Sequence, residues 1–194
     1  AGHSHRAGAI RRRAAATPVG PFLGFEALRR VLDLACANGR GRCVLALTSN
    51  PEGAQVQHAV RDGLTVAGSI LDGVTSQNAA DSAAGVLGSV GMVIGATVGD
   101  AVQKLGLDLA SANAPLLAPG VGAQGATAAD LRPVFGDALG NVLASSSRQS
   151  LGAGPDRAGL RAAPRQPAPP LDPPLDSLGN HVLTVSPVCA GVRP

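Results

Sequence analysis

Five short runs of mostly apolar residues recur along the middle of the chain, each about as long as a buried strand. They cover residues 16–19, 43–47, 91–95, 116–118 and 141–144. Runs that do not alternate with polar residues are typical of strands covered on both faces, as in a parallel sheet. We therefore predict five buried strands.

Segments with apolar residues at helical spacing lie between and after these runs. The spacing predicts helices over residues 25–37, 54–60, 66–74, 127–139 and 148–162. Strands that alternate with helices along the chain favour an α/β fold built on a parallel sheet.

Polar or glycine-rich segments directly follow three of the expected strands. They cover residues 48–53, 96–97 and 119–125. An α/β barrel places its active site at the carboxyl ends of its strands and often binds phosphate in its last loops. About five strands are visible where such a barrel has eight, so we expect an incomplete TIM-type (β/α) barrel.

The richest of these segments is a glycine loop between a strand and a helix. Residues 114–125 read Ala-Pro-Leu-Leu-Ala-Pro-Gly-Val-Gly-Ala-Gln-Gly, with glycines at 120, 122 and 125. Glycines allow backbone N–H groups to approach a ligand closely, and a following helix N-terminus favours an anion. The loop is therefore a candidate phosphate site, although a tight turn gives the same pattern.

Composition favours a folded protein with unusual ends. Hydrophobic residues make up 45% of the chain and charged residues 15%, with a net charge of +3. Residues 1–15 are rich in Arg and Ala and residues 164–194 contain eight of the 15 prolines, so we expect both ends to be disordered. The basic end lacks aromatic residues and any recognised motif, and we expect no nucleic-acid partner.

The remaining composition argues against a membrane protein or a metalloprotein. The uncharged run at residues 82–99 is of membrane-spanning length, but it contains five glycines and is better explained as a buried strand with its loops. Cys36, Cys43 and Cys189 lack the spacing of metal ligands. We expect a cytoplasmic protein with no metal.

Several motifs in this order resemble the orotidine 5′-phosphate decarboxylase family, in its actinobacterial form. The resemblance covers residues 16–163, so the expected domains are 1–15, 16–163 and 164–194. The matching stretches are Pro-Phe-Leu-Gly-Phe at 21–25, Val-Leu-Ala-Leu-Thr-Ser-Asn-Pro-Glu-Gly at 44–53, Val-Gln-His at 56–58, Gly-Ala-Thr at 95–97, the loop at 115–125, Ser-Arg at 147–148 and Gly-Pro at 154–155.

The resemblance implies the last five of the eight strand–helix units of a TIM-type barrel that is usually a homodimer. It implies conversion of orotidine monophosphate to uridine monophosphate and carbon dioxide without a metal or organic cofactor. By the family's motifs, Ser49 would hydrogen-bond the pyrimidine, and Pro119 and Val121 would line the pocket beside the ring. Gln124 and Arg148 would hold the 5′-phosphate, helped by the backbone from Gly122 to Gly125.

The family's catalytic groups have no counterpart in this sequence. They are a lysine on an early strand and an Asp-x-Lys-x-x-Asp motif after the next strand. This sequence has one lysine, Lys104, and no such motif. Residues 18–20 read Pro-Val-Gly where the family has Thr-Val-Ser or Thr-Val-Asn. We therefore assign no catalytic residue.

Three interpretations follow from this combination. The chain is a truncated or frame-disrupted decarboxylase sequence that is inactive alone, a non-catalytic remnant that still binds nucleotide phosphate, or a structural fragment that needs a partner chain to close the barrel. Without the family context, Ser49 would be an ordinary turn residue, and Gln124 and Arg148 would be ordinary surface residues.

Overall fold

A five-stranded, fully parallel sheet forms the centre of the computed structural model, which describes residues 16–121, 126 and 128–145. The strand order is β1-β2-β5-β6-β7, so strands that follow one another in the main sheet are also neighbours in space. Their bounds are Ala16–Val19, Gly41–Leu47, Val90–Ile94, Leu116–Pro119 and Val142–Ser145. All five predicted strands are confirmed, and the described residues form an open sheet rather than a closed barrel.

One row of side chains crosses the sheet and packs against the helical layer. Through the pairings of neighbouring strands, Val19, Val44, Met92, Leu116 and Val142 stand opposite one another. The last four are buried members of the main hydrophobic core, and Val19 packs against it. Burial of such a row is the dominant favourable term in folding, and it fixes the register of the strands.

The next row along the strands, Leu45, Val93, Leu117 and Leu143, is also in register and points to the other face of the sheet. Val93 is buried, but 37% of Leu45 is exposed. Both faces of the sheet are therefore apolar, as expected for strands of a parallel barrel.

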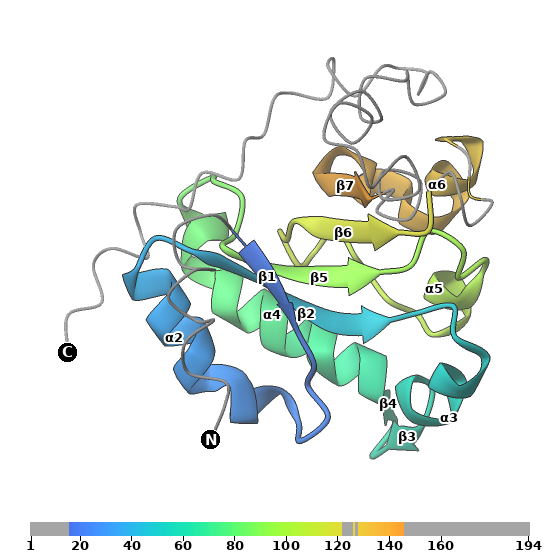
Figure 1. The fold of residues 1–194 in the computed structure, drawn as a ribbon, viewed down its shortest axis with the longest axis horizontal. Helices are drawn as coiled ribbons and strands as arrows, with labels where there is room; N and C mark the ends of the chain where they lie inside the picture. Colours follow the sequence, from blue (N-terminus) through green and yellow to red (C-terminus); the bar gives the residue numbers. More distant parts are fainter. Residues whose placement is uncertain (1–15, 122–125, 127, 146–194) are drawn as a thin grey trace, which may run out of the picture.

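The longest helix, α4 (Val66–Ala83), runs behind β2 and β5 (Figure 1). Its first half presents Ala67, Ile70, Leu71 and Val74 to the core. Thr65 caps it, because the Thr65 hydroxyl accepts a hydrogen bond from the Gly68 N–H at 2.9 Å. The remaining helical segments are shorter: η1 (Phe25–Leu28), α2 (Arg29–Ala37), η2 (Pro51–Gly53), α3 (Ala54–Gln57), α5 (Ala101–Lys104), α6 (Ala128–Phe135) and η3 (Gly136–Asn141).

The second half of α4 packs through polar side chains. Asn78 is 1% exposed; its Oδ1 accepts from the Val90 N–H at 3.1 Å, and its Nδ2 donates to the carbonyls of Val90 at 2.8 Å and Ala112 at 3.1 Å. Asp81, also buried, accepts from the Ser89 N–H at 3.1 Å. These side chains satisfy backbone groups at the start of β5, so α4 continues without large apolar residues.

This arrangement corrects the helix predicted over residues 66–74, which ended nine residues too early. The predicted helix over 54–60 is also too long, because α3 ends at Gln57 and a hairpin of β3 (Val60–Arg61) and β4 (Leu64–Thr65) follows. Its turn residues Asp62 and Gly63 both have positive φ, as a tight hairpin turn requires.

Two other helix predictions are confirmed. Residues 25–37 are helical throughout, with a 3-10 first turn, and the helix predicted over 127–139 appears as α6 followed by η3. The helix predicted over 148–162 and both expected disordered ends lie outside the described residues.

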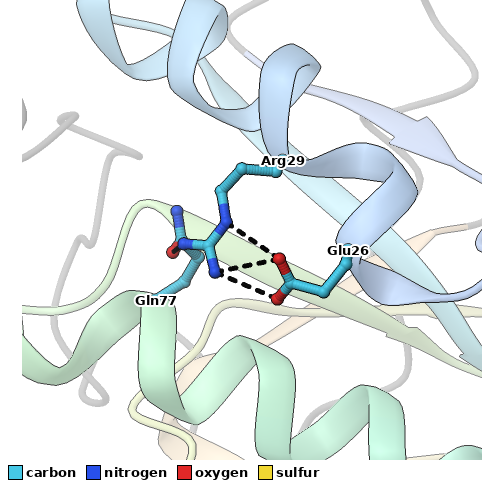
Figure 2. A network of polar contacts seen from close by, with 3 residues as sticks. All are labelled: Glu26, Arg29 and Gln77. Atoms are coloured by element: carbon cyan, nitrogen blue, oxygen red, sulfur yellow. Dashed lines mark hydrogen bonds and ion pairs between the residues drawn. The ribbon is translucent and has the colours of Figure 1, made fainter.

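A polar contact at the surface joins α2 to α4 (Figure 2). Nη2 of Arg29 lies 3.0 and 3.2 Å from the carboxylate oxygens of Glu26, and its Nη1 donates to the Gln77 side chain on α4 at 2.7 Å. The hydrogen bond that Arg29 donates to the Glu26 carboxylate raises the pKa of Arg29. Since this contact is solvent-exposed, it contributes little to stability.

We expect Asn78→Leu to destabilise the chain by about 2–4 kcal/mol, because it leaves buried backbone groups of Val90 and Ala112 without partners. Urea unfolding followed by circular dichroism measures this free energy. Ser76→Ala, at an exposed position of the same helix, is the control and should leave the midpoint unchanged. Equal midpoints for the two variants would contradict this role of Asn78.

Candidate functional site

The carboxyl ends of β2, β5 and β6 are joined to one another by backbone hydrogen bonds. The N–H of Gly95, directly after β5, donates to the Leu47 carbonyl at the end of β2 at 2.9 Å. The next N–H, of Ala96, donates to the Pro119 carbonyl at the end of β6 at 2.8 Å. The loops after these three strands therefore start side by side. This agrees with the expectation that the polar and glycine-rich segments after the strands form one site.

Ser49 lies in the first of these loops, two residues past the end of β2. Its side chain is exposed, and its hydroxyl makes no hydrogen bond within the part of the chain that the structure describes. Gly95 lies against this loop, since a Cβ there would be 3.4 Å from the Ser49 nitrogen, which is an ordinary van der Waals distance. The Ser49 hydroxyl is thus available to a ligand at this edge.

Pro119 and Val121 lie at the end of β6, and both are half-buried. Between them, Gly120 has a φ of 106°, which an L side chain rarely adopts. Its carbonyl accepts from the Ala126 N–H at 3.3 Å, and Val121 forms a parallel bridge with Ala126. The two ends of the glycine loop are therefore held together at the same edge as Ser49.

The remaining substrate-binding residues that we predicted cannot be placed. Gln124 and Arg148, and the phosphate-loop glycines Gly122 and Gly125, lie outside the described residues. The structure thus brings Ser49, Pro119 and Val121 to one edge of the sheet.

Two residues that we did not single out support the Ser49 loop. Gln57, the last residue of α3, accepts a hydrogen bond from the Thr48 N–H at 2.9 Å and donates to the Thr48 hydroxyl at 2.9 Å. Gln57 belongs to one of the matching stretches, but the residue it contacts is nine positions away. No periodicity in the sequence indicates such a pair.

A cavity of about 780 Å³ lies next to this edge. It is bounded by the segment after β1, by β2, by the β3–β4 hairpin and by the start of α4, and mainly apolar side chains such as Phe22, Leu64 and Ile70 line it. Gln57 reaches it, whereas Ser49, Pro119 and Val121 do not. We base the candidate site on the joined strand ends, because Ser49, Pro119 and Val121 lie there.

Charged groups are sparse around the described part of the site. Lys104 is exposed and pairs with Asp100 one helical turn earlier, with 2.9 Å between Nζ and the carboxylate. Within residues 16–121, 126 and 128–145, no three His, Cys, Asp or Glu side chains gather closely enough to hold a metal ion. Across the same residues, no helix is long and apolar enough to cross a membrane.

Cys43, near the start of β2, is a buried nucleophilic side chain. It is 4% exposed and is a free thiol. Burial raises its pKa, so the thiol remains protonated and unreactive near neutral pH. Cys43 is therefore a packing residue and not a candidate nucleophile.

Sequence comparison with known proteins matches this chain to one family. The family described as "Orotidine 5'-phosphate decarboxylase / HUMPS family" matches residues 3–163. The orotidine 5′-phosphate decarboxylase of Salinispora arenicola is 56% identical over 149 residues, and that of Streptomyces coelicolor is 51% identical over 150 residues. Each match covers 76% of this chain and 51% of the relative, so the chain spans about half the length of these relatives.

Solved structures give the same result. A Streptomyces avermitilis protein assigned as orotidine 5′-phosphate decarboxylase superposes with a TM-score of 0.71 at 43% identity, covering 89% of this chain and 62% of that one. A Toxoplasma gondii protein superposes with a TM-score of 0.58 at 22% identity, which supports the fold alone. The expected fold, an incomplete α/β barrel, is confirmed.

Cys43 is expected to resist alkylation in the folded chain. A neutral reagent such as iodoacetamide, followed by peptide mass spectrometry, should modify Cys43 only after unfolding in urea. Because the pKa of the folded thiol lies above that of the unfolded thiol, the contribution of the buried thiol to the free energy of unfolding is fully present at any pH below the unfolded-state pKa. It is lost as the pH rises through the folded-state pKa. Rapid alkylation of Cys43 in the native chain would contradict its burial.

Proposed function

The chain belongs to the orotidine 5′-phosphate decarboxylase / HUMPS family, and from this membership we propose that it carries the nucleotide-binding part of an orotidine 5′-phosphate decarboxylase. The intact enzyme would convert orotidine monophosphate to uridine monophosphate and carbon dioxide. The observation that supports this most directly is the joining of the loops after β2, β5 and β6 at one edge of the sheet.

In the proposed complex, each loop serves a different part of the nucleotide. The Ser49 hydroxyl would hydrogen-bond the pyrimidine, and Pro119 and Val121 would line the pocket beside the ring. Gln124 and Arg148 would hold the 5′-phosphate together with the backbone N–H groups from Gly122 to Gly125. An arginine suits this role, because its guanidinium donates two parallel hydrogen bonds to phosphate oxygens.

Binding of the remote phosphate would contribute to catalysis elsewhere in the molecule. Interactions with a part of the substrate that does not react can offset the cost of orienting and desolvating the reacting centre. The phosphate and ring contacts of this chain would supply that binding energy, with no metal or organic cofactor.

The chemical step itself needs groups that this chain does not contain. Decarboxylation leaves a carbanion, which requires a nearby cation and a proton donor. Lys104 is the one lysine of the sequence, and it is exposed and paired with Asp100. We infer that the chain alone does not decarboxylate, and that the catalytic lysine and aspartates belong to a segment that completes the barrel.

A second candidate function is that of a structural fragment without a ligand, which needs a partner chain to close the barrel. It is favoured by the position of β1 at the edge of the sheet that the described residues form, and by the 37% exposure of Leu45 on the face away from α4. In this case a partner chain would cover the strand edge and the apolar face. Homodimers and a cytoplasmic location fit the family and remain part of the proposal.

A thermal melt with and without uridine monophosphate tests nucleotide binding. At about 100 times its dissociation constant, the ligand should stabilise the chain by about 2.7 kcal/mol and raise the melting midpoint. Arg148→Ala should abolish the increase. Arg132→Ala, an exposed arginine on α6, is the matched control and should preserve it. An unchanged midpoint for the unmodified chain would favour the structural fragment.

A decarboxylation assay tests the inferred lack of catalysis. We expect no turnover of orotidine monophosphate above background, because the one lysine of the sequence, Lys104, is exposed and paired with Asp100. Release of carbon dioxide from the carboxyl-labelled nucleotide is the measurement. Turnover that disappears in Lys104→Ala and persists in Arg132→Ala would show that Lys104 is catalytic and would refute this inference.

A further inference from the structure

The hydrogen bonds between Gln57 and Thr48 constrain the loop that carries Ser49. Both polar atoms of the Gln57 side-chain amide form hydrogen bonds with Thr48. Oε1 accepts from the Thr48 N–H, and Nε2 donates to the Thr48 hydroxyl, each at 2.9 Å. A two-point contact fixes both the peptide and the side chain of Thr48. Because Ser49 is the next residue, its direction relative to the end of β2 is fixed as well.

Glycines on two sides leave room for this arrangement. A Cβ at Gly53 would lie 3.0 Å from Gln57 Nε2 and 3.1 Å from Thr48 Oγ1. On the other side, a Cβ at Gly95 would lie 3.4 Å from the Ser49 nitrogen. The Thr48–Ser49 backbone is therefore confined between the start of α3 and the end of β5.

The segment that supplies Gln57 contributes little to the core. Neither η2 nor α3 contains a buried residue. Both hydrogen bonds of Gln57 to Thr48 are partly buried. Removing them should therefore disturb the loop more than the packing of the sheet against α4.

We propose that Gln57 is a positioning residue that holds Ser49 in the orientation needed to bind the pyrimidine ring. This inference rests on the proposed function, in which Ser49 contacts the ring. Gln57 itself does not contact the nucleotide. It acts through Thr48, so its loss should weaken recognition of the ring and spare recognition of the phosphate.

Two ligands that share the sugar phosphate separate these effects. Uridine monophosphate carries the ring, and ribose 5-phosphate lacks it. In Gln57→Met, which keeps the length of the side chain but removes both hydrogen bonds, we expect uridine monophosphate to bind about tenfold more weakly. Ribose 5-phosphate should bind as it does to the unmodified chain. Calorimetric titration of the full chain measures both affinities.

Gln55→Met is the matched control, because Gln55 is an exposed glutamine on the same helix. It should leave both affinities unchanged. Gln57→Glu should largely restore uridine monophosphate binding, since its carboxylate can accept from both the N–H and the hydroxyl of Thr48. Equal weakening of the two ligands in Gln57→Met, or weakening of neither, would overturn the positioning role.

A double-variant comparison tests whether Gln57 acts through Ser49. If it does, Gln57→Met should cause no further loss of uridine monophosphate binding once Ser49→Ala is present. Additive losses would overturn the proposal. An unmodified chain that binds neither ligand would refute the proposed function itself, and with it the role in ring recognition.

Amide hydrogen exchange gives a measurement that does not need a ligand. The Thr48 N–H should be protected in the unmodified chain and in Gln55→Met, and it should exchange faster in Gln57→Met. Equal exchange rates in all three would overturn the proposal even if uridine monophosphate binds.

Discussion

The burial of one row of apolar side chains across five parallel strands underlies the whole structure. Val44, Met92 and Leu116 stand opposite one another in the register and are fully buried against the helical layer. A slip of one residue in any strand would turn these side chains to the other face. The register in turn places the carboxyl ends of β2, β5 and β6 at one edge, and the candidate site exists because these ends coincide.

At that edge, backbone atoms perform much of the organisation. The N–H groups of Gly95 and Ala96 connect the loops after β2 and β6, and the positive φ of Gly120 turns the chain into the glycine loop. The Ser49 backbone nitrogen lies next to position 95, where a Cβ would be 3.4 Å away. In the proposed function, this framework would receive the pyrimidine ring and the 5′-phosphate.

The chain corresponds to about half the length of the relatives that it matches. The match to the Salinispora arenicola protein covers 76% of this chain and 51% of that relative. Among residues 16–121, 126 and 128–145, β1 and β7 are the two edge strands of the sheet. The apolar row containing Leu45, which a closed barrel would enclose, is here partly exposed.

The sequence by itself determined the strands, their parallel arrangement and the segments that gather at their ends. These features follow from continuous apolar runs and from the glycines and polar residues directly after them, which are local signals. It also determined the family, through motifs such as the one around Ser49. Gln124 and Arg148 remain predictions, since they lie outside the described residues.

Only the tertiary structure decided the features that depend on residues far apart in sequence. Helix α4 continues to Ala83 because Asn78 and Asp81 hydrogen-bond the backbone at the start of β5. The pairing of Gln57 with Thr48 likewise arises from the way the chain turns after β2. A polar residue in isolation gives no sign of its partner, because hydrogen bonds to water and to protein are nearly equivalent until packing excludes the water. The pattern of apolar residues therefore predicted the strands and most of the helices of this protein, whereas its polar contacts were decided by the tertiary structure.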